Sequence, residues 1–251
     1  MAVLKAAIRP TPFAGPARSL YRRLWAVPGA AELNARYDLQ ASEVMRRVLT
    51  IDSNCLDVGA HSGSILRVML ALAAQGRHVT FEPLPHLAAQ LRLDFPRVQV
   101  HEIALSDTTG ETTFEYVVSN PGYSGLRRRR YPRADEEIRT ISVRTARMDD
   151  LLPADHRIAL MKIDVEGAEL HVLRGGRETL KRCKPFVIFE LGQEGAAAYY
   201  GWTPANLYDL LVGQCGLHIS VMSGWLAGAC PFTRSAFVDQ CRRDFYFLAH
   251  P

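Results

Sequence analysis

Short apolar runs alternate with helical stretches along the first half of the chain, and this order constrains the fold more than any other feature. Apolar runs over residues 54–59 and 78–83 predict buried strands, and residues 98–105 predict a third strand and the turn after it. Residues 64–74, which are strongly apolar, and residues 84–95, which Pro96 stops, predict helices between them. The order strand–helix–strand–helix–strand is typical of a parallel sheet covered by helices.

The pattern changes in the middle of the chain and then resumes. Residues 111–118 and 140–145 alternate apolar and polar side chains, which predicts an antiparallel pair of half-exposed strands. They flank a segment rich in Gly, Pro and Arg, so we interpret residues 111–145 as an insertion and a candidate substrate lid. Further strands are expected over residues 158–165, 185–191, 218–222 and 244–250, and helices over residues 37–50, 168–183 (interrupted at Gly175-Gly176) and 203–215 (with Thr203 as its N-cap).

The composition is that of an ordinary globular protein. The 251 residues, 48% of them apolar, suffice for one well-buried domain, and a net charge of +4 is too weak to indicate a nucleic-acid partner. Five cysteines without a C-x-x-C pair argue against a disulfide framework or a zinc site. They favour a reducing compartment, so we expect a cytoplasmic protein. No apolar run approaches the roughly 18 residues that span a bilayer.

The first 31 residues carry five basic side chains and no acidic one. They lack a continuous apolar run, so no secretory signal is predicted. We interpret residues 1–36 as a basic arm or helix that precedes a main domain of residues 37–251. A peripheral membrane contact through an amphipathic helix around residues 17–26 is the alternative.

The segment Asp57–Gly63 (DVGAHSG) follows the first apolar run and opens a helix. Glycines there let the backbone turn tightly and approach a ligand. An acid at the end of the strand suits a ligand with an ammonium group, such as S-adenosylmethionine, and repels phosphate. Dinucleotide sites have G-x-G-x-x-G, whereas Ala60-His61 replaces the middle glycine here. The motif therefore favours S-adenosylmethionine over a dinucleotide.

Two further acids follow predicted strands. Glu82 ends the second strand, where a carboxylate can accept hydrogen bonds from both hydroxyls of a ribose. Asp107 follows Ala104 after the third strand. In one interpretation Asp107 accepts a hydrogen bond from an adenine amino group; in the other, Ser106 and Asp107 only begin a turn toward Gly110.

The most heavily charged segment is Lys162–Glu169 (KIDVEGAE). Asp164 and Glu166 lie where a strand ends, and Glu190 ends the next strand, so the three acids are expected in one crevice. Ionisable groups in such a place are costly unless they are paired or used. The alternative is a Lys–carboxylate network that also caps the next helix. A divalent metal held by Asp164 and Glu166 is a weaker alternative.

The insertion contains Arg127–Arg130, four consecutive arginines, beside Tyr123 and Ser124. A lid that recognises an anionic group, a nucleic-acid patch, and a solvated loop neutralised by nearby acids are the three interpretations.

Taken together, these residues resemble the FkbM-family methyltransferases. The matching motifs are LDVGAHSG, FEP, IALSD, GYSGL, MDDLL, KIDVEGAE and PFVIFE, and they extend over roughly residues 37 to 250. The resemblance implies a class I, Rossmann-like three-layer α/β sandwich that uses S-adenosylmethionine. The family is associated with O-methylation, often of sugar hydroxyls in glycans, glycolipids or polyketide-type natural products. One departure is His61, where the family usually has Asn.

The resemblance assigns candidate roles to individual residues. Glu166 or Glu190 is expected to act as the base or to orient the acceptor hydroxyl, with Asp164 beside the methyl group. The alternatives are a small-metabolite or RNA acceptor, a nicotinamide-dependent reductase, and a non-catalytic cofactor-binding domain. The candidate cofactor residues are Asp57, Gly59, Ala60, His61, Gly63, Glu82, Ala104 and Asp107, and the candidate substrate residues are Lys162, Tyr123, Ser124 and Arg127.

Overall fold

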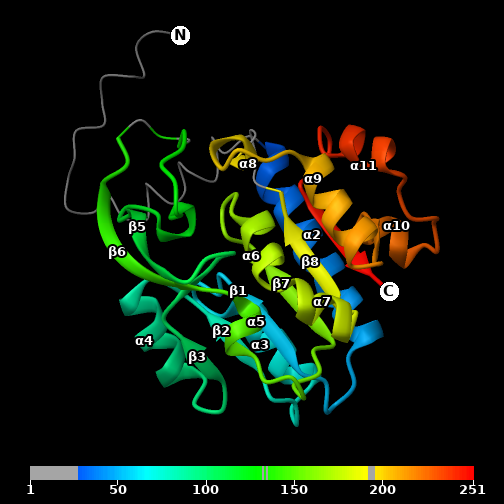
Figure 1. The fold of residues 1–251 in the computed structure, drawn as a ribbon, viewed down its shortest axis with the longest axis horizontal. Coiled ribbons are helices and arrows are strands. Elements are labelled where there is room, and N and C mark those ends of the chain that lie inside the picture. Colours follow the sequence, from blue (N-terminus) through cyan, green and yellow to red (C-terminus); the bar gives the residue numbers. More distant parts are fainter. Residues whose placement is uncertain (1–27, 132, 134, 192–195) are drawn as a thin grey trace, which may run out of the picture. The chain divides into compact units, whose positions relative to one another are not determined.

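The computed structural model describes residues 28–131, 133, 135–191 and 196–251 (Figure 1). The chain divides into two compact units, residues 1–40 and 41–251. In the first unit the described residues form the start of helix α2 (Pro28–Val48). This helix begins before the predicted residue 37, because good helix formers precede the apolar periodicity on which the prediction rested. The predicted basic arm up to residue 27 lies outside the described residues.

A seven-stranded sheet forms the centre of the second unit, in the order β3-β2-β1-β7-β8-β10-β9. The first five strands in this order run parallel, and β10 pairs antiparallel with both neighbours. This arrangement confirms the predicted Rossmann-like α/β fold with an antiparallel edge. The strands are β1 (Cys55–Val58), β2 (Val79–Phe81), β3 (Gln99–His101), β7 (Leu160–Ile163), β8 (Phe186–Glu190), β9 (His218–Ser220) and β10 (Tyr246–His250).

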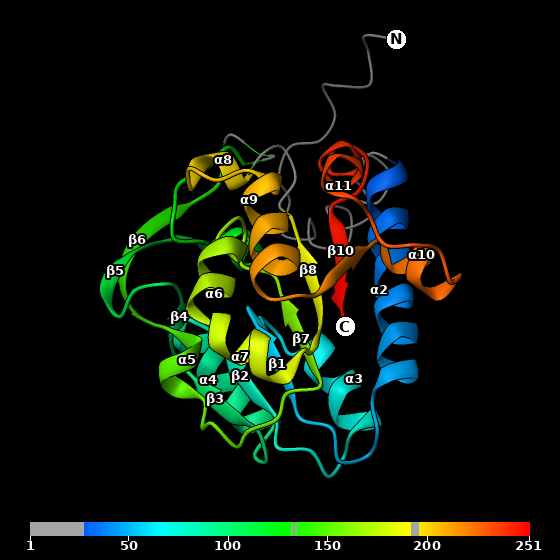
Figure 2. The same cartoon turned by 45° about the vertical axis from the view of Figure 1, so that its right-hand side comes forward.

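Helices cover both faces of this sheet. Figure 2 shows α6 (Glu169–Gly175), α7 (Arg177–Cys183) and α9 (Pro204–Tyr208) on one side of the strands and α3 (Ser64–Leu72) on the other. The predicted break at Gly175-Gly176 separates α6 from α7. Helix α4 (Pro85–Asp94) joins β2 to β3.

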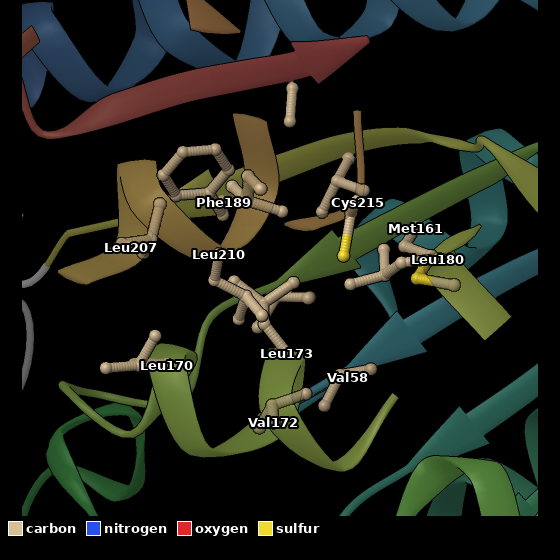
Figure 3. Packing of buried hydrophobic residues seen from close by; sticks show 14 of the residues in the cluster. Val58, Met161, Leu170, Val172, Leu173, Leu180, Phe189, Leu207, Leu210 and Cys215 are labelled. Atoms are coloured by element: carbon tan, nitrogen blue, oxygen red, sulfur yellow. The ribbon is translucent and has the colours of Figure 1, made fainter. Parts of the chain in front are cut away.

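The core forms where α6, α7 and α9 meet the sheet. Leu170 and Leu173 of α6 and Leu207 of α9 are fully buried, as is Phe189 of β8. Figure 3 shows these side chains packed in one layer. Their burial stabilises each helix by about 1.5–3 kcal/mol for each large side chain.

A second sheet holds the insertion, in the order β4-β6-β5. Its strands are β4 (Ala104–Leu105), β5 (Gly110–Val117) and β6 (Ile138–Ala146), and the short helix η1 (Pro121–Tyr123) lies between β5 and β6. The pairing of β5 with β6 is antiparallel, as predicted. Residues 104–105, expected in the turn after the third strand, form β4 because they pair with β6. Ala104 joins a separate small core, and Leu105 joins the main one.

The last part of the chain departs from the prediction in detail. The helix begins at Pro204 as expected, but it continues as a π-helix, η3 (Asp209–Gln214). Residues 221–222 are not strand, because α10 (Met222–Leu226) begins there. Helices α5 (Met148–Leu151), α8 (Ala196–Tyr199) and α11 (Arg234–Gln240) were not predicted, since such short helices show little periodicity. Among the described helices, none combines the length and apolarity that crossing a membrane requires.

Candidate active site

The loop between β1 and α3 depends on unusual backbone conformations. Gly59 and Gly63 have φ of 79° and 74°, in the left-handed region. A side chain on Gly59 would overlap the carbonyl oxygen of Asp164, so the loop rests directly on the end of β7. His61 also has a positive φ, 49°. Asn and His are among the residues that tolerate this region best, which explains why His can stand where the family usually has Asn.

Glu82 ties this loop to the end of β2. Its Oε2 accepts a hydrogen bond from the backbone N–H of His61 at 2.9 Å, and its Oε1 accepts one from Leu84 at 3.0 Å. Burial raises the pKa of Glu82, while these two N–H donors oppose the shift. The carboxylate is thus fixed at the carboxyl end of the sheet, where ligands bind in open α/β folds.

Asp57 is a buried carboxylate whose two oxygens have no hydrogen-bond partner. Burial raises its pKa to about 6, and the charge of Lys162 opposes the shift. An unpaired buried carboxylate is costly, so this residue fits a ligand that brings positive charge. The amino-acid end of S-adenosylmethionine carries an ammonium group of this kind.

A cavity with about 590 Å³ of empty space opens beside this loop. This space includes open solvent at the mouth of the cavity. Several predicted residues line it: Gly59, His61, Glu82, Ala104, Ser124, Asp164 and Glu166. Sequence reasoning missed an apolar wall made by Phe81, Leu84, Ile103, Leu105 and Phe114. Such a wall suits a flat heterocycle.

The other predicted site residues do not line this cavity. They are Asp57, Ala60, Gly63, Asp107, Lys162, Tyr123, Arg127 and Glu190. Asp107 has its Oδ2 3.0 Å from Nδ1 of His171. Ser124 accepts a hydrogen bond from the backbone N–H of Val117 at 3.0 Å, which holds the insertion loop closed.

Asp164 stands at the centre of a polar network. Nζ of Lys162 donates to its Oδ2 at 2.8 Å, and the hydroxyl of Tyr246 donates to the same atom at 3.0 Å. Burial alone would raise the pKa of Asp164, but Lys162 and the hydrogen bonds lower it. Burial and the neighbouring Asp164 raise the pKa of Glu190 well above its usual range. The two pKa values therefore shift in opposite directions, which favours the ionised form of Asp164 and the protonated form of Glu190.

Sequence reasoning missed Tyr246. It lies on β10 directly opposite Glu190 of β8 in the antiparallel register. No local motif marks it, because its importance comes from strand pairing over a long sequence separation.

Glu166 projects into the cavity from the turn after β7. Its φ is 59°, a left-handed conformation that non-glycine residues rarely adopt. Burial and Asp164 raise its pKa to about 8, and Arg129, with which it forms an ion pair, opposes the shift. Strained backbone and a perturbed pKa in a cavity are typical of a catalytic group.

Arg129 is the member of the four-arginine run that reaches the cavity acids. Its side chain is 10% exposed, and its guanidinium lies 5.5 Å from the ring of Tyr123 and 5.9 Å from that of Tyr131. Arg127, the predicted candidate, is exposed. Sequence alone does not distinguish the four arginines, because the choice depends on how the loop folds back.

Glu169 shows that the network interpretation of KIDVEGAE is also correct in part. Its Oε1 accepts hydrogen bonds from the backbone N–H groups of Val165 and Gly167, at 3.2 and 3.1 Å. This acid therefore fixes the turn that presents Glu166. No group of three or more His, Cys, Asp or Glu in the described ranges is arranged to hold a metal ion.

Comparison with known proteins identifies the family of this chain. The family model of the methyltransferase FkbM domain matches residues 57–211, from the first strand-end acid to η3. The chain belongs to the FkbM methyltransferase family. It is therefore an S-adenosylmethionine-dependent methyltransferase.

Two curated relatives of this FkbM methyltransferase are informative. The 2-O-methyltransferase NoeI of Sinorhizobium fredii (strain NBRC 101917 / NGR234) is 30% identical over 192 residues, which cover 67% of this chain and 76% of NoeI. The AMB antimetabolite synthetase AmbE of Pseudomonas aeruginosa is 30% identical over 211 residues, covering 69% of this chain and only 10% of AmbE. A solved structure, the methyltransferase FkbM from Methylobacillus flagellatus KT, aligns with a TM-score of 0.49 at 16% identity, over 80% of this chain and 44% of that chain.

Proposed function

We propose that this FkbM methyltransferase transfers a methyl group to a sugar hydroxyl and that Glu166 is the base. The observation that carries the proposal is the position of Glu166: a strained, cavity-lining carboxylate whose pKa lies near 8. The sugar acceptor is supported by the similarity to NoeI, a 2-O-methyltransferase. An alcohol is a weak nucleophile, so a positioned base that takes its proton speeds the attack by roughly 10²–10⁴-fold.

S-adenosylmethionine, when bound, supplies an electrophilic methyl group. In our proposal Asp57, Gly59, Glu82 and the apolar wall hold it. Asp164, kept ionised by Lys162 and Tyr246, adds negative charge on the same side of the cavity. The acceptor oxygen must lie in line with the methyl group, and the insertion loop excludes water from this contact. As the oxygen attacks, its proton passes to a carboxylate oxygen of Glu166.

The position of Glu190 argues for Glu166 as the base. Glu190 is hydrogen-bonded to Asp164 and is not among the residues that line the cavity, whereas Glu166 lines it. We assign Glu190 and Tyr246 to positioning Asp164, and Lys162 to keeping it charged. The remaining cofactor-side residues, Ala60, His61, Gly63, Ala104 and Asp107, shape the loops around the donor in this proposal.

The test is an acceptor screen followed by one substitution. The protein is incubated with S-adenosylmethionine and a panel of neutral glycosides, and S-adenosylhomocysteine and methylated sugar are measured by mass spectrometry. Glu166→Gln is expected to lower turnover by about 10²–10⁴-fold while S-adenosylhomocysteine binds with unchanged affinity. Glu178→Gln, on an exposed position of α7, is the matched control.

Two outcomes would contradict the proposal. Methylation of a non-sugar acceptor such as RNA, with no glycoside accepted, would remove the sugar assignment. Near-normal turnover by Glu166→Gln would remove the base assignment and leave the methyltransferase activity itself intact.

A further inference from the structure

A second hollow lies at the other end of α6 from the methyl-transfer cavity. It has about 720 Å³ of empty space, open to solvent, and it shares no lining residue with the first cavity. Its walls come from the end of β6, the junction of α6 and α7, α9 and the π-helix η3. The lining residues are Arg147, Arg174, Arg177, Asn206, Asp209, Leu210 and Gln214.

The helix break at Gly175-Gly176 brings three arginines together. A side chain on Gly175 would overlap the carbonyl oxygen of Ser106 and would lie 3.4 Å from the Cα of Arg147. The backbone of α6 therefore packs directly on Ser106, which follows β4, and contacts Arg147, which follows β6. This close approach places Arg147 beside Arg174 and Arg177, which precede and follow the break.

Acidic side chains compensate only part of the positive charge of this hollow. Arg174 has no acidic partner within the described part of the chain. Arg147 is 3.8 Å from Asp149, whose two oxygens already accept backbone N–H groups of α7 at 2.9 and 3.0 Å. Asp209 is held by Arg234 from outside the hollow, at 2.7 and 2.9 Å. Arg177 is paired with Glu178 at 3.0 Å, on the exposed surface of α7. Since Arg234 neutralises the one lining acid, the lining keeps a net positive charge, and Arg174 is its arginine without an acidic partner in the described part of the chain.

The remaining walls add hydrogen-bond donors. Oδ1 of Asn206 accepts from the backbone N–H and the hydroxyl of Thr203, at 2.9 and 3.0 Å, which leaves its amino group as the free end. Residues 209–214 form a π-helix. This conformation is rare in proteins, and where it occurs it is often at a functional site. Gln214, the last residue of that helix, lines the hollow.

We propose that this hollow is a binding site for a phosphate-bearing anion of the diphosphate class. Each guanidinium group presents a planar pair of N–H donors that matches two phosphate oxygens. Several guanidinium groups directed at one hollow therefore favour an anion with more than one phosphate. The site is separate from the methyl-transfer cavity, and the inference does not depend on the sugar acceptor or on Glu166.

The test is isothermal titration of the whole protein with inorganic pyrophosphate. The wild type is expected to bind it, and Arg174→Gln to weaken binding by about tenfold. Arg92→Gln, which removes an exposed arginine of α4, is the matched control and is expected to bind like the wild type. Unchanged affinity for S-adenosylhomocysteine shows that each variant is folded.

Three results would overturn the proposal: no binding by folded wild type, equal weakening by Arg92→Gln, or competition by S-adenosylhomocysteine, which would place the anion in the methyl-transfer cavity. A free diphosphate and a lipid-linked diphosphate share this chemistry. A second arm therefore uses phosphatidylcholine vesicles with and without a prenyl diphosphate. Vesicle binding that needs the prenyl diphosphate and Arg174 identifies a lipid-borne source, and pyrophosphate binding alone identifies a soluble one.

Discussion

At the scale of single residues, the raised pKa of Glu166 predicts how the enzyme responds to pH. A base works only when it is deprotonated, so turnover should be lost as the pH falls below about 8 and should level off above it. A rate profile measured between about pH 6 and pH 10 checks this. A profile that is flat through pH 8 would show that another group accepts the proton.

Arg129 allows a sharper version of the same experiment. Its positive charge opposes the rise in the pKa of Glu166, so Arg129→Met should move the midpoint of the profile to higher pH. Arg127→Met is the control, because that exposed neighbour has no ion pair with Glu166. If Arg129→Met leaves the midpoint unchanged, the ion pair with Glu166 does not set the pKa of the group that accepts the proton.

The buried carboxyl group of Asp57 makes the stability of the ligand-free protein depend on pH. Its pKa of about 6 lies above the unfolded value of 3.8, so the folded state holds the proton more tightly. The stability that this provides is present below pH 4 and is lost as the pH rises through 6. The loss is roughly 3 kcal/mol, from two pKa units at about 1.4 kcal/mol each.

Asp57→Asn should therefore raise the melting temperature of the ligand-free protein at pH 7.5 by several degrees, and the gain should disappear below pH 4. The same variant should bind S-adenosylmethionine at least about tenfold more weakly. Thermal melts across pH and titration calorimetry measure the two effects. An Asn variant that is no more stable at pH 7.5 would contradict the buried-charge argument.

Much of the cavity was visible in the sequence because its residues follow strand ends. Asp164 and Glu166 come from one motif, and Gly59, His61 and Glu82 from two others. Tyr246 and Arg129 were not visible as site residues. Each reaches the acids through tertiary structure: Tyr246 through pairing of β10 with β8, and Arg129 through a loop that folds back.

At the scale of elements, the turn between β1 and α3 is the most sensitive. Gly59→Ala combines a left-handed φ with overlap against the backbone of Asp164, so it should cost several kcal/mol and abolish cofactor binding. Gly213→Ala, in η3 with open space around it, should be neutral or slightly stabilising. Chemical denaturation compares the two. A mild effect of Gly59→Ala would mean that the loop is free to move.

Elements were predictable where periodicity was long and fully buried, as in the parallel strands and α6–α7. The predictions failed where pairing decides the outcome. Residues 104–105 were expected in a turn, but they form a short strand because they pair with β6. The π-helix η3 has the apolar spacing of an ordinary α-helix. Its wider hydrogen-bond pattern, from residue i to residue i+5, cannot be read from that spacing.

At the scale of the whole molecule, ligand binding should stabilise the second unit as one body. S-adenosylhomocysteine at about 100 times its dissociation constant should add roughly 2.7 kcal/mol, which raises the melting temperature by about 5–10 °C. NAD should give no shift, because Asp57 and the missing middle glycine disfavour a pyrophosphate. A shift with NAD and none with S-adenosylhomocysteine would contradict the assigned donor.

The insertion gives this fold a division that matters for its evolution. In the proposed site most donor-side residues belong to the parallel sheet, with Leu105 and Phe114 added by the second sheet, while Arg129, Tyr123 and Ser124 lie in the loop between β5 and β6. Changes confined to that loop can therefore alter which acceptor the enzyme modifies while both sheets stay unchanged. Libraries that randomise the loop alone are the natural starting point for new acceptors.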